Sequence, residues 1–219
     1  MRKTIFPVLL TAISVMVQAD PPQFLQIVRE PINAGDAARY EEIENETAAA
    51  CVALKCPHPH LALETLTGQK EIWWFNFFES EEQRLQVTRD YENNRPLMEV
   101  LTRNSVRKSK YTGQITDKIW RYRTGPGPGV WDLPGARYAF MTFGHSALNA
   151  GGPVFVEPDG THLAIRFART LEDAMRIAVN GATILGFRPS WGLPARQWID
   201  ADSEFWNVNP AASQREPAE

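Results

Sequence analysis

Two histidines, His58 and His60, flank Pro59 in a segment that we expect to be extended. Alternate side chains of an extended chain point the same way, so the pair could supply two metal ligands. A metal site needs a third ligand, for which the sequence offers Glu64, His145 or His162. We favour the simpler interpretation, a loop histidine followed by the first residue of a strand, and expect no metal site.

A second chemical possibility lies in polar residues within apolar strands. The strand expected over residues 71–78 contains two tryptophans and three phenylalanines, which are typical of a core. Asn76 stands among them, and a buried amide must find hydrogen bonds or cost free energy. A few polar groups in an apolar cavity are the usual composition of a small-molecule site. The candidate ligand-binding residues are His60, Glu64, Trp74, Asn76 and Arg166.

Cys51 and Cys56 are the two cysteines of the chain. Within a continuous helix, five residues rotate the side chain by about 140° and raise it by about 7.5 Å, which is too far for a disulfide. Pro57 disfavours helical backbone at Cys56, so a helix that ends between the cysteines would allow the bridge. The sequence leaves both a disulfide and two buried thiols open. No catalytic motif of serine, histidine and aspartate, or of paired carboxylates, is recognisable.

Residues 1–19 have the three parts of a secretory signal peptide. A basic start is followed by an apolar stretch from Thr4 to Val17, which is too short to span a bilayer as a stable helix. Ala19 completes a small-residue cleavage site, so we expect a mature chain that begins at Asp20. The sequence therefore predicts a periplasmic or secreted protein with no membrane attachment after cleavage.

Composition is that of a globular protein. The formal net charge is −3 and charged residues make up 22% of the chain. Nucleic-acid binding needs a basic face, for which this composition gives no support. About two hundred residues after cleavage are enough for one large domain or two small ones.

The first half of the mature chain reads as strand, helix, strand, strand, helix, strand, which is the order of the ferredoxin-like fold. Apolar residues at three- and four-residue spacing predict an amphipathic helix after Asp36. The glutamates of that helix, Glu44 among them, are interpreted as a solvated face. The expected strands cover residues 24–32, 60–66, 71–78 and 115–123.

The second half repeats this pattern with its first helix missing. It begins with a strand over residues 137–143, and the Asp-Gly pair at 159–160 predicts a hairpin. We expect a helix over residues 171–183 and a last strand over 197–208. The predicted divisions are a signal peptide at 1–19, the first half at 20–124, a Gly/Pro linker at 125–135, the second half at 136–208 and a disordered tail at 209–219.

Both faces of the strand over residues 71–78 are apolar, and one helix layer can cover only one of them. The other face needs a second apolar surface, because several exposed aromatic rings would be costly. The strands of the second half offer such a surface. We therefore predict that the two halves pack sheet to sheet within one chain.

Several stretches resemble exported bacterial proteins of unassigned activity. They are Phe24-Leu-Gln-Ile-Val-Arg-Glu-Pro, Cys56-Pro-His-Pro-His-Leu-Ala-Leu-Glu-Thr-Leu-Thr-Gly, Glu71-Ile-Trp-Trp and Asp202-Ser-Glu-Phe-Trp. Those proteins are similar to tandem dimeric α+β barrel domains, the fold of antibiotic-biosynthesis monooxygenases and of related haem-handling proteins. The resemblance implies an α+β fold of two ferredoxin-like halves, and it implies little about chemistry.

Three functional hypotheses follow. The first is an α+β barrel protein that binds a small hydrophobic or aromatic ligand between its sheets. The second is a cofactor-independent monooxygenase acting on an aromatic substrate. The third is haem binding, although the sequence requires no cofactor. The sequence does not decide between enzyme and binder, and it fits either a monomer with an internal pseudo-dimer or a homodimer. The candidate axial ligands of a haem are His58, His60, His145 and His162.

Overall fold

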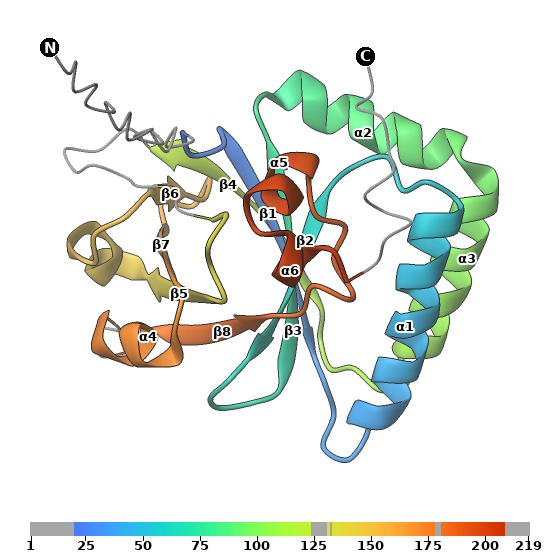
Figure 1. The fold of residues 1–219 in the computed structure, drawn as a ribbon, viewed down its shortest axis with the longest axis horizontal. Helices are drawn as coiled ribbons and strands as arrows, with labels where there is room; N and C mark the ends of the chain where they lie inside the picture. Colours follow the sequence, from blue (N-terminus) through green and yellow to red (C-terminus); the bar gives the residue numbers. More distant parts are fainter. Residues whose placement is uncertain (1–19, 124–130, 132, 178–180, 209–219) are drawn as a thin grey trace, which may run out of the picture.

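Eight strands close into one antiparallel barrel in the computed structural model of the protein (Figure 1). The structure describes residues 20–123, 131, 133–177 and 181–208. The expected signal peptide, most of the expected linker and the expected tail lie outside these residues. None of the described helices is long and apolar enough to cross a membrane.

The elements largely follow the sequence pattern. The strands are β1 (Phe24–Pro31), β2 (His60–Thr65), β3 (Glu71–Phe78), β4 (Thr116–Arg123), β5 (Tyr138–Phe143), β6 (Val154–Val156), β7 (His162–Ala168) and β8 (Thr183–Phe187). The helices are α1 (Ala37–Ala53), α2 (Glu81–Asn93), α3 (Arg95–Lys108), the 3-10 helix η1 (Gly144–Asn149), α4 (Leu171–Ile177), α5 (Arg196–Ala201) and α6 (Ser203–Trp206).

The barrel contains two sets of four strands in the same relative order. The first four strands lie in the order β4–β1–β3–β2, and the last four lie in the order β8–β5–β7–β6. The sets are joined by hydrogen-bonded seams between β2 and β8 and between β4 and β6. The sequence predicts sheet-to-sheet packing of the two halves, and the structure adds paired edges that close the two sets of strands into one barrel. Pairing of their edges removes unpaired strand edges, which are a liability in open sheets.

Alternation along β3 assigns its two apolar faces. Trp73, Phe75 and Phe77 join the core inside the barrel. Ile72 and Trp74 face outward and pack in the cluster that contains Tyr40 of α1. Both faces are thus covered, as the sequence predicts, because successive side chains of a strand point to opposite sides.

The outer face of the first set is covered by α1 and α3, which lie side by side at the right of Figure 1. The interpretation of Glu44 as solvated is wrong, since its exposure is 1%. Glu44 lies four residues after Tyr40, so the two side chains share the buried stripe of α1. Ser80 caps the N-terminus of α2, because its hydroxyl accepts a hydrogen bond from the Gln83 N–H.

Cys51 and Cys56 are joined by a disulfide. Helix α1 ends at Ala53, and Lys55 adopts a left-handed backbone with φ of 58°. This turn brings Cys56 back toward the last turn of the helix, where its N–H donates to the Cys51 carbonyl. The end of the helix between the cysteines is the condition that the sequence sets for a bridge.

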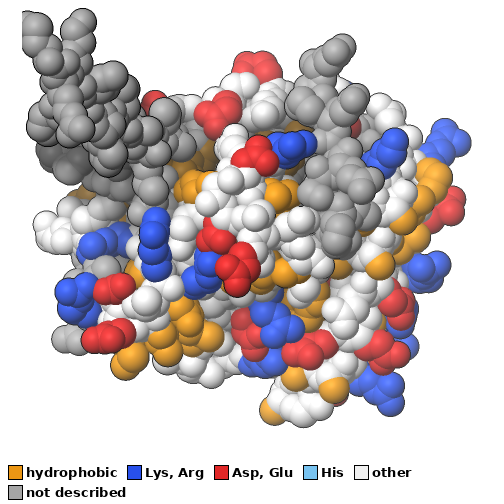
Figure 2. Space-filling view, viewed as in Figure 1, with side chains coloured by type: hydrophobic (Ala, Val, Ile, Leu, Met, Phe, Trp, Pro, Cys, Tyr) orange, Lys and Arg blue, Asp and Glu red, His pale blue; other side chains and the backbone are white. Residues whose placement is uncertain are grey.

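The outer face of the second set has shorter cover. Helix α4 packs there with Ala174 against Phe140 and Ala168, and the short 3-10 helix η1 lies between β5 and β6. Leu171 and Met175 of α4 remain exposed. Figure 2 shows hydrophobic side chains gathered on this side of the molecule, near α4 and β8.

The expected last strand over residues 197–208 is wrong, because this segment forms α5 and α6. Its buried residues, Trp198, Ile199 and Trp206, do not alternate as a half-buried strand requires. The last strand is instead β8, which begins at the end of the expected helix over residues 171–183. Helix α4 ends at Ile177, and residues 178–180 lie outside the described part of the chain.

Candidate functional site

One end of the barrel is closed by the C-terminal helices, α5 and α6, which are drawn in red near the centre of Figure 1. Trp198 of α5 contacts Phe77 with ring centroids 5.7 Å apart. Trp206 of α6 contacts Phe187 at 5.5 Å. Trp131 joins the same layer, with its ring 5.5 Å from that of Phe77. We call this the closed end.

The opposite end is where β1 ends and β3 begins, and it has charged residues on the inward face. Arg29 binds Glu71 through Nε at 3.0 Å and through Nη2 at 2.8 Å, both to Oε2. Its guanidinium lies 4.3 Å from the Trp73 ring centroid. The Trp73 indole N–H donates to the same carboxylate at 2.7 Å. Glu71 therefore fixes both a cation and an indole.

A second ion pair stands on the neighbouring part of this rim. Lys118 Nζ lies 2.8 Å from Glu157 Oε2 and 6.0 Å from the Trp120 ring centroid. Lys118 precedes Trp120 by two residues on β4, so both side chains point inward. We call Arg29, Glu71, Lys118 and Glu157, with the rings beneath them, the charged end.

Three aromatic rings lie beneath these ion pairs. The ring of Phe143 stands 6.1 Å from Trp73 and 5.9 Å from Trp120, measured between centroids. The side chain of Trp120 is only 3% exposed, and its indole N–H has no hydrogen-bond partner in the part of the chain that the structure describes. A buried donor without a partner costs free energy of about 1–3 kcal/mol. The charged end therefore holds a polar atom that a bound molecule could satisfy.

The sequence analysis does not identify the charged end, although the sequence contains a pattern that marks it. Arg29, Glu71 and Lys118 each lie two residues from an apolar inward residue of the same strand. A charged residue that continues the apolar face at the end of a strand marks the rim of a barrel. The missing information is which strand ends gather in space.

All five residues predicted for ligand binding point away from the barrel interior, and four of them lie on the neighbouring strands β2 and β3. His60 lies opposite Asn76, and the His60 ring is 6.0 Å from that of Trp74, on the outer face of the barrel. Glu64, on the same face, pairs with Lys70 at 3.0 Å and with Arg188 at 3.0 Å. The structure therefore places these four side chains outside the barrel, and their part in ligand binding stays a prediction. Alternation places their neighbours, such as Trp73, on the inside.

Arg166, the fifth, lies on the outer face of β7 in the second set of strands. Its Nη1 donates to the Ala150 carbonyl at 3.2 Å. Burial lowers the pKa of Arg166 from its ordinary value. The structure does not bring Arg166 together with the four residues on β2 and β3.

The histidines do not form a site. The His58 Nε2–H donates to the Phe77 carbonyl at 2.8 Å, and burial lowers the pKa of His58, so its ring is neutral near pH 7. His162 accepts a hydrogen bond from Arg123 at 2.7 Å, and His145 is exposed on η1. Among the described residues, no group of three His, Cys, Asp or Glu is placed to hold a metal ion.

A haem inside the barrel does not fit these residues. On the described strands, His60 and His162 both occupy outward positions, next to the inward Leu61 and Leu163. An axial histidine must reach the cofactor from the surface that encloses it. The structure therefore offers no support for the haem hypothesis.

A buried polar cluster lies outside the barrel, between β1 and the two long helices. Lys108 Nζ is 3.0 Å from Glu30 Oε2 and also contacts Glu44, while the Tyr40 hydroxyl donates to Glu30. Burial raises the pKa of Tyr40 and of Glu44. Burial alone would lower the pKa of Lys108, but Glu44 and Glu30 outweigh it and raise that pKa. The cluster ties α1 and α3 to the sheet.

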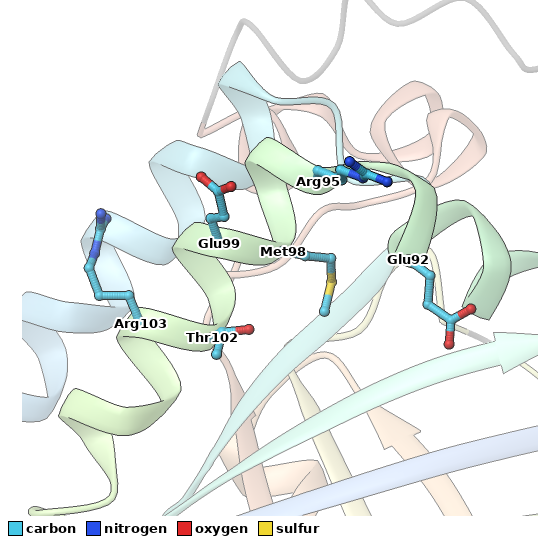
Figure 3. Close-up of a pocket in the computed structure, with 6 residues that line it drawn as sticks. All are labelled: Glu92, Arg95, Met98, Glu99, Thr102 and Arg103. Carbon is cyan, nitrogen blue, oxygen red and sulfur yellow. The ribbon is translucent and has the colours of Figure 1, made fainter.

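A surface hollow along α2 and α3 is a weaker candidate. It is lined by six residues of these helices, among them Arg95, Met98 and Glu99 (Figure 3). The charged groups in Figure 3 point away from one another. No set of polar groups converges there as a ligand site requires.

No protein-family model matches the sequence, and no curated protein matches it. Among solved structures, a proposed monooxygenase from Fusobacterium nucleatum is 6% identical, with a TM-score of 0.49 over 77% of this chain and 92% of that one. A proposed chlorite dismutase is 6% identical, with a TM-score of 0.47 over 78% and 97%. An anthrone oxidase-like protein is 10% identical, with a TM-score of 0.46 over 76% and 92%. Likenesses below a TM-score of 0.5 carry no argument about the chemistry of this chain.

Proposed function

We propose that the protein binds a small aromatic ligand at the charged end of its barrel. The observation that carries this proposal is the buried Trp120 N–H, which lies among aromatic rings and has no hydrogen-bond partner within the described residues. A ligand with a hydrogen-bond acceptor would satisfy this donor and would recover the free energy lost by its burial. Apolar walls with one oriented polar group are the usual makeup of a small-molecule site.

Phe143 supports a route into the site. Its ring is half-buried between Trp73 and Trp120. The next residue, Gly144, has a positive φ of 73°, which glycine adopts at little cost. A ligand ring that displaces Phe143 would contact both tryptophans and reach the Trp120 N–H.

The test is calorimetric titration of the protein with 2-naphthamide, a flat aromatic molecule with a carbonyl acceptor. We expect Trp120→Phe to weaken binding roughly threefold to tenfold, the effect of one hydrogen bond. Trp74→Phe is the matched control, because the Trp74 N–H is also buried without a partner but lies outside the barrel. Equal effects of the two variants, or no binding by the unaltered protein, would overturn the proposal.

The monooxygenase hypothesis is tested in the same samples. Oxygen uptake with a panel of hydroquinones would show turnover, whereas the proposed binder consumes no oxygen. If the protein consumes oxygen and Trp120→Phe abolishes this consumption, the charged end is a catalytic site rather than a binding site.

We also propose that the protein works outside the cytoplasm, in the periplasm or as a secreted protein. The N-terminal pattern of residues 1–19 supports export, and the Cys51–Cys56 disulfide suits an oxidising compartment. Mass spectrometry of the protein recovered from its host should give a mature chain that begins at Asp20. An intact Met1 would contradict export.

The two sets of strands are, in our proposal, ferredoxin-like halves that form a pseudo-dimer within one chain. The shared strand order supports this, as do the two seams that join the sets. A chain that closes its own barrel should be a monomer by light scattering. A fragment of residues 20–124 should aggregate or dimerise, because it lacks the strands that complete the barrel.

A further inference from the structure

We infer that the ligand of the charged end is an anion, specifically an aromatic carboxylate. This inference rests on the proposed binding function and deepens it by naming the ligand class. It is carried by the unequal exposure of the charges at this end.

Both ion pairs expose their cation and bury their carboxylate. The side chain of Arg29 is 40% exposed, whereas that of its partner Glu71 is 10% exposed. The side chain of Lys118 is 46% exposed, whereas that of Glu157 is 13% exposed. Within these two pairs the accessible charges are therefore positive, although the four formal charges cancel.

The two cations also have N–H groups that their carboxylate partners do not use. Arg29 uses Nε and Nη2 for Glu71, and no hydrogen bond from Nη1 is formed within the described residues. Lys118 has three N–H bonds, and one carboxylate oxygen of Glu157 lies at hydrogen-bond distance. A ligand anion would add to each pair without displacing the buried carboxylate.

The positions of the cations suit one carboxylate joined to a ring. On β1 and β4, Arg29 is opposite Thr116 and Lys118 is opposite Ile27, so the two cations are diagonal neighbours on the inward face. Arg29 lies over Trp73 and Lys118 lies beside Trp120. A ring between these tryptophans would direct its carboxylate toward the space between the two cations.

The experiment compares 2-naphthoate with 2-naphthamide, which have the same ring and nearly the same shape. In calorimetric titrations of the full chain at low salt, we expect naphthoate to bind about tenfold more tightly than the amide. Added salt should reduce this preference, because the rim is partly exposed. Lys118→Gln should lower the affinity for naphthoate about fivefold and change the affinity for the amide less than twofold.

Lys70→Gln is the matched control. Lys70 is 36% exposed and pairs with Glu64 and Glu41, but it lies on the outer surface. The Lys70→Gln variant removes the same charge from the chain as Lys118→Gln. Equal losses of naphthoate affinity in both variants would indicate a general charge effect and would overturn the inference. If Lys118→Gln fails to fold, Lys118→Arg is tested instead. Lys118→Arg keeps the positive charge, so it should keep the preference for naphthoate over the amide. Loss of that preference would contradict the inference.

The two proposals fail in different ways. Equal affinity for naphthoate and the amide, with both weakened by Trp120→Phe, would overturn the anionic ligand and leave the binding function standing. Absence of binding by both compounds would overturn the binding function and the inference with it.

Discussion

The two ends of the barrel are formed by the same strands but are lined by different kinds of side chain. At the closed end, inward aromatic residues are covered by Trp198 and Trp206, and the indole N–H of Trp206 donates to the Pro134 carbonyl at 3.4 Å. At the charged end, Arg29 and Glu71 cover Trp73, while the N–H of Trp120 has no hydrogen-bond partner among the described residues. The closed end is thus packed with satisfied groups, and the charged end keeps the unpaired donor on which our binding proposal rests.

The largest effect expected from this comparison is at the closed end. Trp206→Ala should lower the free energy of unfolding by about 3–5 kcal/mol, because it removes a fully buried ring and leaves a cavity beside Phe187. Urea unfolding followed by circular dichroism measures this loss. The neighbouring Phe205→Ala should cost less, since Phe205 is only half-buried. A loss below about 1 kcal/mol for Trp206→Ala would show that α6 is not part of the folded core.

A smaller decrease in the free energy of unfolding is expected from a substitution at the charged end. Glu71→Gln keeps the size of the side chain but removes the charge that holds Arg29 and the Trp73 N–H. Loss of these charge-assisted hydrogen bonds should cost about 1–3 kcal/mol. Glu157→Gln is the control, and it should cost less than about 1 kcal/mol because Glu157 holds Lys118 alone, whereas Glu71 holds both Arg29 and the Trp73 N–H. Equal losses would contradict the view that Glu71 organises this end.

Much of the local structure could be predicted from the sequence. Apolar residues on both faces of residues 71–78 predict a strand covered on both sides, and the hairpin at 159–160 is where the Asp-Gly pair places it. Glu44 could also have been assigned correctly, since its spacing from Tyr40 puts it on the buried stripe of α1. These features depend on local periodicity, which a sequence displays directly.

The closure of the barrel and the charged end could not be predicted in the same way. The seam between β2 and β8 pairs Leu63 with Phe187, which is far away in the sequence, and no local pattern encodes such a partner. Lys118 and Glu157 likewise meet only because β4 pairs with β6. The predicted ligand-binding residues lie on the outward faces of their strands, whereas the rim is formed by charged residues on inward faces near strand ends.

The smallest effect expected concerns the ion pair that borders the closed end. Arg137 Nη2 lies 2.7 Å from Asp202 Oδ2, and the Arg137 guanidinium lies 3.7 Å from the Phe205 ring centroid. Both charged groups are partly exposed, so Asp202→Asn should lower the free energy of unfolding by about 0.2–1 kcal/mol. The loss should shrink at high salt, because solvent ions screen exposed pairs. Urea unfolding at low and high ionic strength measures both quantities. If α5 and α6 depended on this pair rather than on Trp198 and Trp206, the loss would approach that of Trp206→Ala. The closed end would then be held by charge, and the contrast between the two ends would disappear.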